Sequence, residues 1–289
     1  MNKIGDSELI LNPDGSVYHL HLKPENVAEN VIVVGDQGRV EMISKYFDKI
    51  EFKAQSREFV THTGTFNGKR VTALSTGIGT DNIDIVMNEL DAAVNIDLVN
   101  RVPKTTHTAL NVVRIGTSGA LQGDIPVDSF VLSTHGLGMD GLLNFYDVDS
   151  INDAALEQAF IAHTNWNKRF NHPYFVEGSQ ELINKLAPGK HLGITATACG
   201  FYGPQGRVLR LPLQMNDLNE KLTSFNYNGH RITNFEMETS ALFGLGKLLG
   251  HNTATVCTIV ANRIRKEFSK DYKTSVDALI QNVLQTLTA

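Results

Sequence analysis

Short apolar runs rich in β-branched residues alternate along this chain with segments of helical periodicity. Residues 31–34 form one such run, and residues 40–47 after it place Val40, Ile43 and Phe47 on one helical face. The same order recurs to the end of the chain. Because strands that alternate with helices pack as a sheet covered by helices, the pattern predicts an α/β fold with a mixed, largely parallel central sheet flanked by helices.

The predicted elements follow one another without a break in composition, an internal repeat or a low-complexity segment. The length of 289 residues is normal for a single α/β unit, so we expect one domain over residues 18–289 after a loose polar arm over residues 1–17. Further strands are expected at 18–22, 60–66, 70–74, 112–115, 127–134, 193–198, 231–234 and 253–261, with a hairpin turn at Asn67-Gly68. Further helices are expected at 83–94, 153–163, 180–186, 236–249 and 272–287.

Composition narrows the functional classes. A net charge of −5 gives no general attraction for nucleic acid or for an anionic membrane, so any anion site must be local. The two cysteines, Cys199 and Cys257, come without a CxxC or His-rich ligand spacing, which argues against a disulfide framework and a structural metal. No apolar run has membrane-spanning length, and residues 1–13 lack the apolar segment of a signal peptide, so we expect a cytoplasmic protein.

An arginine stands inside the apolar run of the expected central strand. Arg114 is followed by Gly116-Thr117-Ser118-Gly119. A guanidinium there is costly unless an anion or a carboxylate meets it, and the adjoining hydroxyls and approachable backbone N–H groups suit a phosphate. Two interpretations stay open from this stretch alone: a phosphate site, or an arginine paired to a nearby acid beside an ordinary glycine turn.

A second glycine-containing loop follows the strand at 31–34. Gly35-Asp36-Gln37-Gly38-Arg39 lies between that strand and the next helix, a geometry that aims backbone N–H groups at an anion. The loop matches neither GxGxxG nor a Walker motif, so dinucleotide or nucleoside triphosphate binding has no support.

Four loop segments stand out together: residues 35–39, residues 114–117, Phe201 to Arg207, and Phe235-Glu236-Met237-Glu238. In order and spacing they resemble the uridine phosphorylases of the nucleoside phosphorylase family, and the likeness runs from about His19 to Arg263. The resemblance implies the nucleoside phosphorylase fold and phosphorolysis of uridine, with 2′-deoxyuridine left open. Phosphate would attack C1′ of the sugar, giving uracil and ribose 1-phosphate. No cofactor is implied, because inorganic phosphate is a co-substrate.

The resemblance assigns residues to phosphate. Gly35, Arg39, Arg114 and Thr117 match the family's phosphate-binding positions, and Arg57 matches an arginine that reaches in from the neighbouring subunit. Arginines around a dianion suppress its charge repulsion and fix its oxygens in position. The implied protein is therefore a homo-oligomer with shared active sites, which takes a small nucleoside and phosphate, and no nucleic acid or membrane, as partners.

The resemblance also assigns a base site. Gln205 and Arg207 match the pair that reads uracil, Phe201 packs against the base, and Arg263 supports Arg207 or a closing loop. A glutamine amide can donate to O2 and accept from N3–H, whereas an arginine only donates, which suits O4. Cytosine has an amino group in place of O4, so this pair should reject it.

The remaining matched residues belong to the ribose. Glu238 matches a carboxylate that accepts hydrogen bonds from sugar hydroxyls, with Met237 and Ser118 toward the sugar and His19 lent to the 5′-hydroxyl by the partner subunit. We expect the catalytic residues to be Arg114, Gln205, Arg207 and Glu238. Glu236 fits a different interpretation, an acid favoured by the dipole at a helix N-terminus.

Some positions depart from the family's pattern. Asn262 stands where purine-acting relatives place an aspartate that protonates the purine, and it cannot act as that acid. Asn82 replaces a serine that, with a glutamate matched by Glu58, holds a monovalent cation between subunits in some members, which argues against that cation here. Residues 100–108 and part of 135–175 look like insertions.

Two alternatives to a uridine phosphorylase stay open. One is a phosphorylase or hydrolase of the same fold for a purine or another nucleoside. The other is a non-catalytic protein that binds a nucleoside or phosphate, which would require a broken site, although the matched residues are all present.

Overall fold

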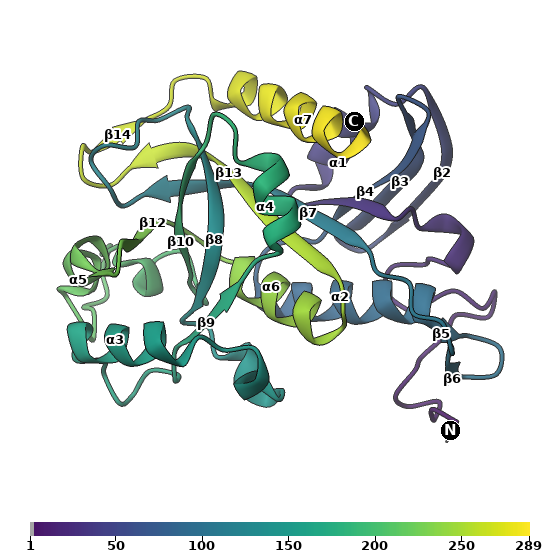
Figure 1. Ribbon diagram of the computed structural model, residues 1–289, viewed down its shortest axis with the longest axis horizontal. Helices are drawn as coiled ribbons and strands as arrows, with labels where there is room; N and C mark the ends of the chain where they lie inside the picture. Colours follow the sequence, from purple (N-terminus) through teal and green to yellow (C-terminus); the bar gives the residue numbers. More distant parts are fainter. Residues whose placement is uncertain (1–2) are drawn as a thin grey trace.

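A strongly twisted mixed sheet runs through the centre of the computed structural model, which describes residues 3–289 (Figure 1). On one side of the sheet, β7 (Asn111–Ala120) lies parallel to β1 (Asn30–Val34) and to β13 (Asn252–Asn262), and β1 lies parallel to β4 (Lys69–Ser75). The carboxyl ends of these strands therefore lie at one edge of the sheet, where open α/β sheets bind their ligands.

The other side of the sheet curls back on the first. There β10 (His191–Thr197) lies parallel to both β8 (Phe130–Gly138) and β12 (His230–Glu236). β8 pairs antiparallel with β13, and β12 pairs antiparallel with β7 at Asn234–Ala120. The strands β7, β13, β8, β10 and β12 thus form a closed circle, which brings the end of β12 beside β7.

Antiparallel strands extend the sheet beyond β4. The hairpin of β3 (Phe59–Phe66) and β4 turns at Asn67-Gly68, where both residues have positive φ, as the sequence predicts. β2 (Lys49–Ser56) pairs with β3 and was not expected, because its exposed edge carries polar residues instead of an apolar run. The short strands are β5 (Ile96–Asp97), β6 (Val102–Pro103), β9 (Tyr174–Glu177), β11 (Asn226–Tyr227) and β14 (Glu267–Phe268).

Helices cover both faces of the sheet. Successive residues of a strand therefore point to opposite faces and pack against different helices. Ile32 and Val34 of β1 pack in one core with α1 (Gln37–Ser44), α4 (Gln180–Leu186) and α7 (Tyr272–Thr288). Val31 and Val33 pack in the other with α2 (Thr80–Asn95) and α6 (Thr239–Leu248). A third core holds α3 (Ala154–Thr164) and α5 (Leu218–Ser224) against β10 and β12. Single 3-10 turns lie at Pro24–Asn26, Leu142–Phe145, Val148–Ser150 and Gly203–Gln205.

The α/β prediction and the mixed central sheet are confirmed, and the expected strands from residue 60 onward are present with shifted ends. The strand expected at 18–22 is wrong. Residues 18–20 form a turn, in which the backbone N–H groups of His19 and Leu20 donate to the Glu89 carboxylate of α2. Leu20 and Leu22 are buried, so the alternation there reflects a loop pressed onto the core.

The sequence predicts a loose polar arm over residues 1–17, but residues 3–17 pack against the domain. Leu9 and Val17 are buried in the core beside α2, and Leu11 forms a bridge with Val17. Residues 1–2 of the expected arm lie outside the described residues. The polar composition of this segment is misleading because Leu9 and Val17 turn inward, although Ile10 is exposed.

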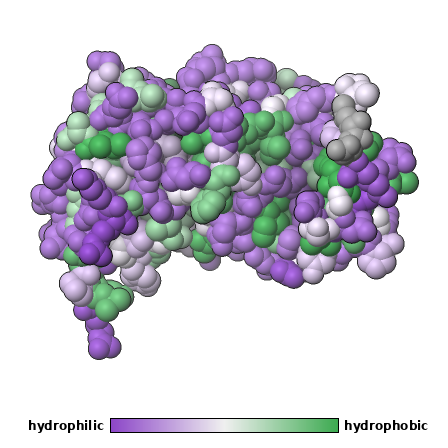
Figure 2. Space-filling view, turned by 90° about the horizontal axis from the view of Figure 1, so that it is seen from below, coloured by the Kyte–Doolittle hydropathy of each residue, from purple (hydrophilic) through white to green (hydrophobic). Residues whose placement is uncertain are grey.

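The surface combines polar and apolar side chains. Figure 2 shows the face seen from below in Figure 1, on which hydrophilic side chains surround separate apolar patches. Among residues 3–289, no helix has both the length and the apolar character that crossing a membrane requires.

Candidate active site

A cavity of about 960 Å³ opens where the carboxyl ends of β1, β10 and β12 meet the second half of β7. Gly35 follows β1, Thr117 lies in β7, and the turn with Gln205 follows β10. The structure brings together in this cavity eleven of the residues selected from the sequence: Gly35, Arg39, Arg114, Thr117, Ser118, Phe201, Gln205, Arg207, Met237, Glu238 and Arg263.

Arg114 is buried at the floor of the cavity and is paired with acids. Its guanidinium contacts the Glu238 carboxylate and lies 3.3 Å from an oxygen of Glu236. Burial alone would lower the pKa of Arg114, but the two carboxylates hold it above its ordinary value. Its Nε is buried without a hydrogen-bond partner among residues 3–289. The pairing of this arginine with nearby acids is confirmed, and its contact with phosphate stays a prediction.

Arg39 is a second cation close to the first. It begins in the first turn of α1, which Asp36 caps by accepting from the Gly38 backbone N–H at 2.9 Å. Its Nη1 donates to the Ile115 carbonyl at 3.1 Å. Burial and then repulsion by Arg114 lower the pKa of Arg39. Because Arg39 and Arg114 are partly desolvated and repel each other, an anion between them would be favoured.

Gly35 fits the close backbone approach that this loop needs. A Cβ at this position would lie 3.3 Å from the Gly77 carbonyl oxygen of the loop after β4. The absence of a side chain therefore lets the two glycine loops pack against each other at the cavity.

The base-reading candidates form one hydrogen-bonded unit. Nη1 of Arg207 donates to Gln205 Oε1 and to the Phe201 carbonyl, each at 2.6 Å, and the guanidinium stacks over the Phe201 ring at 3.8 Å from its centroid. Burial, followed by repulsion from Arg263, lowers the pKa of Arg207. Gln205 is 4% exposed, so its amide is fixed and desolvated before any ligand arrives.

Arg263 faces the same part of the cavity from the segment after β13. Its Nη1 is buried without a hydrogen-bond partner within the described residues, and burial lowers its pKa. A buried, unpaired guanidinium nitrogen is expected to meet an acceptor on a ligand or on bound water.

Glu238 lines the same cavity as Arg114 and Gln205. One of its carboxylate oxygens accepts from the Gly79 backbone N–H at 2.8 Å and the other contacts Arg114. Burial raises the pKa of Glu238, Arg114 opposes that rise, and Glu236 adds to it. Ser118 Oγ accepts from Asn234 at 2.9 Å.

Glu236 has the structural role expected of it. Its carboxylate accepts from the backbone N–H groups of Glu238 and Thr239 at 2.9 Å, and from the Thr197 hydroxyl at 2.8 Å. These bonds cap the start of α6, so this helix begins at Thr239 and not at residue 236. Glu238, two residues on, is thereby directed into the cavity.

His19 and Arg57 do not line the cavity of their own chain. His19 Nδ1 lies 2.6 Å from Glu89, and Arg57 occupies the turn before β3 with a φ of 53°. Both contact Tyr18, whose ring lies 4.8 Å from the His19 ring and 5.9 Å from the Arg57 guanidinium carbon. Their assignment to a neighbouring subunit's site stays a prediction.

Asn262 is committed to the backbone. Its amide donates to the carbonyls of Gln122 and Ile125, at 2.9 and 2.7 Å, and accepts from the N–H groups of Ile264 and Arg265. Every hydrogen-bonding atom of this side chain is thus used, and it holds the turn after β13.

The structure adds lining residues that sequence reasoning missed. The exposed apolar side chains of Ile78 and Phe268 stand at the cavity, 67% and 66% exposed. No sequence pattern predicts Phe268 as a site residue, because it lies in a polar segment and reaches the cavity only through the pairing of β14 with β13. Glu58 and Asn82 also line the cavity.

Comparison with known proteins agrees with this geometry. The family model described as the phosphorylase superfamily matches residues 29–289. The chain belongs to this superfamily.

Individual relatives cover nearly the whole chain. A uridine phosphorylase of Thermococcus kodakarensis is 29% identical over 279 residues, which is 93% of this chain and 86% of that protein. A uridine phosphorylase of Haemophilus influenzae is 27% identical over 88% of this chain and 90% of its own. Among solved structures, a Trypanosoma brucei nucleoside phosphorylase described as showing uridine phosphorylase activity superposes with a TM-score of 0.88 at 29% identity, covering 96% of this chain and 99% of its own.

Proposed function

We propose that this protein is a uridine phosphorylase, a pentosyltransferase that uses phosphate to cleave uridine into uracil and ribose 1-phosphate. The observation that carries the proposal is the arrangement of one cavity. The half-buried Arg39 and the buried Arg114 lie on one side, the Gln205–Arg207 unit lies on the other, and Glu238 stands between them. The uridine phosphorylases among the relatives support the same assignment.

The phosphate side supplies the nucleophile. Arg39 and Arg114 repel each other when the cavity holds no anion, and a phosphate dianion would relieve that repulsion. The free Nε–H of Arg114 and the hydroxyl of Thr117 then fix oxygens of the dianion in a water-poor region. Such fixation orients one oxygen toward C1′ and lowers the entropic cost of attack.

The base side stabilises the leaving group. Arg207 already holds Gln205 Oε1, so the Gln205 amide is oriented with its N–H groups toward the cavity, where uracil O2 would accept. The second lone pair of Gln205 Oε1 accepts from N3–H, and Arg207 donates to O4. As the glycosidic bond breaks, negative charge spreads onto the uracil oxygens, so these contacts strengthen in the transition state.

Glu238 serves the sugar. A carboxylate beside the ribose accepts hydrogen bonds from its hydroxyls and stabilises the positive charge that develops at an oxocarbenium-like transition state. The hydrogen bond from the Gly79 N–H fixes the carboxylate, while Ser118 and Met237 complete the sugar-facing wall. No cofactor or metal enters this scheme, since phosphate itself is the co-substrate.

The proposal includes a shared active site in a homo-oligomer of a cytoplasmic enzyme. His19 and Arg57 gather around Tyr18 at one place on the surface, and a second subunit docked there would receive a cation for phosphate and a histidine for the 5′-hydroxyl. Such sharing requires at least a dimer.

A base-selectivity assay tests the proposed function. Release of the free base is measured from uridine, 2′-deoxyuridine, cytidine and inosine, with and without phosphate. We expect turnover of uridine that depends on phosphate, and none of cytidine, because cytosine lacks the acceptor and the N3 hydrogen that the Gln205–Arg207 unit reads. An unchanged rate without phosphate would indicate a hydrolase. Cleavage of inosine with no turnover of uridine would assign the site to purines.

A further inference from the structure

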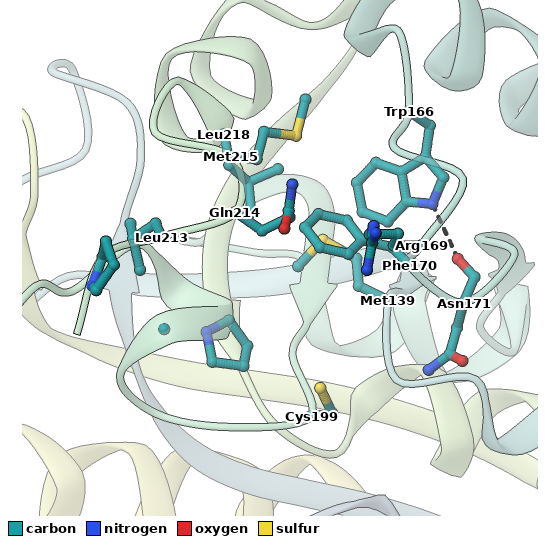
Figure 3. Close-up of a pocket in the computed structure, with 13 residues that line it drawn as sticks. Met139, Trp166, Arg169, Phe170, Asn171, Cys199, Leu213, Gln214, Met215 and Leu218 are labelled. Atoms are coloured by element: carbon teal, nitrogen blue, oxygen red, sulfur yellow. Dashed lines mark hydrogen bonds between the residues drawn. The ribbon is translucent and has the colours of Figure 1, made fainter.

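A second cavity of about 370 Å³ lies beside the base-reading turn and plays no part in the proposed reaction (Figure 3). Its residues come from separate parts of the chain: Met139 after β8, Cys199 after β10, the segment 166–171 after α3, and the segment 212–218 that leads into α5. Because β8 and β10 are parallel, this cavity also lies at carboxyl ends of strands, the usual place for a ligand in such sheets.

The walls are aromatic and aliphatic. Trp166 and Phe170 meet edge to face with ring centroids 5.2 Å apart, and Figure 3 shows them opposite the segment with Leu213 and Met215. The Trp166 Nε1–H donates to the Asn171 carbonyl at 2.9 Å, a bond drawn in Figure 3 that fixes the indole. The cavity therefore offers ordered ring surfaces to an aromatic group without demanding a polar partner for the indole.

The charge in the cavity has one sign. Arg169 lines it, no aspartate or glutamate does, and the Arg169 side chain forms no ion pair or hydrogen bond within residues 3–289. Arg169 is solvent-exposed, so its guanidinium lies at the open side of the cavity. An uncompensated guanidinium at an apolar cavity favours a ligand that carries a carboxylate.

The cavity is adjacent to the reaction site but separate from it. The turn Gly203–Gln205 lies between the two: Gly203 and Pro204 line the second cavity, whereas Gln205 lines the first. The two cavities have no lining residue in common.

We propose that this second cavity is a binding site for an aromatic monocarboxylate. The ring lies between the Trp166–Phe170 pair and the Leu213–Met215 wall, and the carboxylate meets the Arg169 guanidinium.

The chain contains a single tryptophan, so its intrinsic fluorescence reports on this cavity. The probes are 3-phenylpropanoate and its neutral analogue 3-phenylpropanamide, which share a ring and a chain and differ in charge. We expect a saturable change in tryptophan fluorescence with the carboxylate and an affinity at least about tenfold weaker for the amide, because the amide loses a charge-assisted bond to Arg169. Calorimetric titration of the same samples gives the stoichiometry.

Two variants and one competition experiment locate the site. Arg169→Gln should weaken carboxylate binding about tenfold or more, whereas Arg210→Gln, an exposed arginine that lines neither cavity, should leave it unchanged. Both substitutions are at exposed positions, so the fold is retained, which thermal melting verifies. Saturating uracil with phosphate should leave carboxylate binding intact.

The proposal is overturned by equal affinity for the carboxylate and the amide, by unchanged binding in Arg169→Gln, or by no saturable binding in either titration. Displacement of the carboxylate by uracil with phosphate would place it in the reaction cavity and also overturn the proposal. None of these results depends on whether the enzyme cleaves uridine, so failure here is distinguishable from failure of the proposed function.

Discussion

Arg114 is both an ion-pair partner and a lining residue of the reaction cavity. Its burial with Glu236 and Glu238 shows why a sequence pattern alone leaves two interpretations open: the paired acids lie more than 120 residues further along the chain. The remaining Nε–H, without a partner among the described residues, is the part that phosphate would use.

Arg114→Ala should reduce both activity and stability. Loss of the phosphate donor lowers kcat/KM for phosphorolysis by about 10²–10³-fold, and the orphaned Glu238 and Glu236 carboxylates lower the free energy of unfolding by about 3–5 kcal/mol. Steady-state kinetics at varied phosphate and denaturant titration measure the two effects. Arg231→Gln, which breaks an exposed pair with Asp124, is the control. Unchanged turnover in folded Arg114→Ala would reject the phosphate assignment.

Arg207→Lys tests the base-reading unit with the charge retained. A lysine cannot hold Gln205 Oε1 and the Phe201 carbonyl while its head stacks over the Phe201 ring. We expect kcat/KM for uridine to fall by about 10²-fold, with the KM for phosphate little changed. Kinetics with each substrate varied separately give the answer. A fall in the affinity for phosphate alone would contradict the assignment to the base.

At the scale of elements, turn residues and apolar periodicity predict those helices and strands that depend mainly on local sequence. The hairpin at Asn67-Gly68, the helix α4 and the end of α7 follow from turn chemistry and apolar periodicity. The turn at residues 18–20 does not, because its alternating leucines are buried by contact with α2, which no local pattern contains. β2 is missed for a related reason: an exposed edge strand has few apolar residues to reveal it.

Helix α1 and strand β3 are joined by a buried histidine, which makes their packing pH-dependent. His62 Nδ1 lies 2.7 Å from Ser44 Oγ, and burial lowers the pKa of His62 below its ordinary value of 6.5. A depressed pKa in the folded state means that this contribution to stability is present above pH 6.5 and is lost as the pH falls through the lowered value.

His62→Gln should therefore flatten the loss of stability on acidification below pH 6.5. Denaturant unfolding of the variant and the unsubstituted protein, at matched pH values from neutral to mildly acidic, measures the slope. Identical slopes for the two proteins would show that His62 does not titrate with folding.

At the scale of the whole molecule, the site exists because the sheet closes on itself. The pairing of β12 with β7 places Glu238 beside Arg114, and the same closure puts the Gln205 turn across from both. The family resemblance could group these residues, but periodicity could not, since a closed circle of strands depends on long-range pairing. Neither the family resemblance nor periodicity predicts Phe268 at the site, because only the pairing of β14 with β13 brings it to the cavity.

Shared sites can be tested by subunit complementation. An Arg57→Ala chain retains Arg114, and an Arg114→Ala chain retains Arg57, so a mixed oligomer contains some sites with both arginines. If Arg57 serves the neighbouring subunit, each variant alone is impaired and co-expression restores part of the activity. Activity no higher than the average of the two separate variants would place Arg57 outside the partner's site.

The most direct measurement of the central proposal identifies the sugar product. Uridine is incubated with the enzyme and phosphate, and the products are followed by phosphorus NMR together with chromatography of the base. The arrangement of Arg39 and Arg114 opposite the Gln205–Arg207 unit predicts ribose 1-phosphate and uracil in equal amounts. Uracil accompanied by free ribose, or no uracil at all, would contradict it.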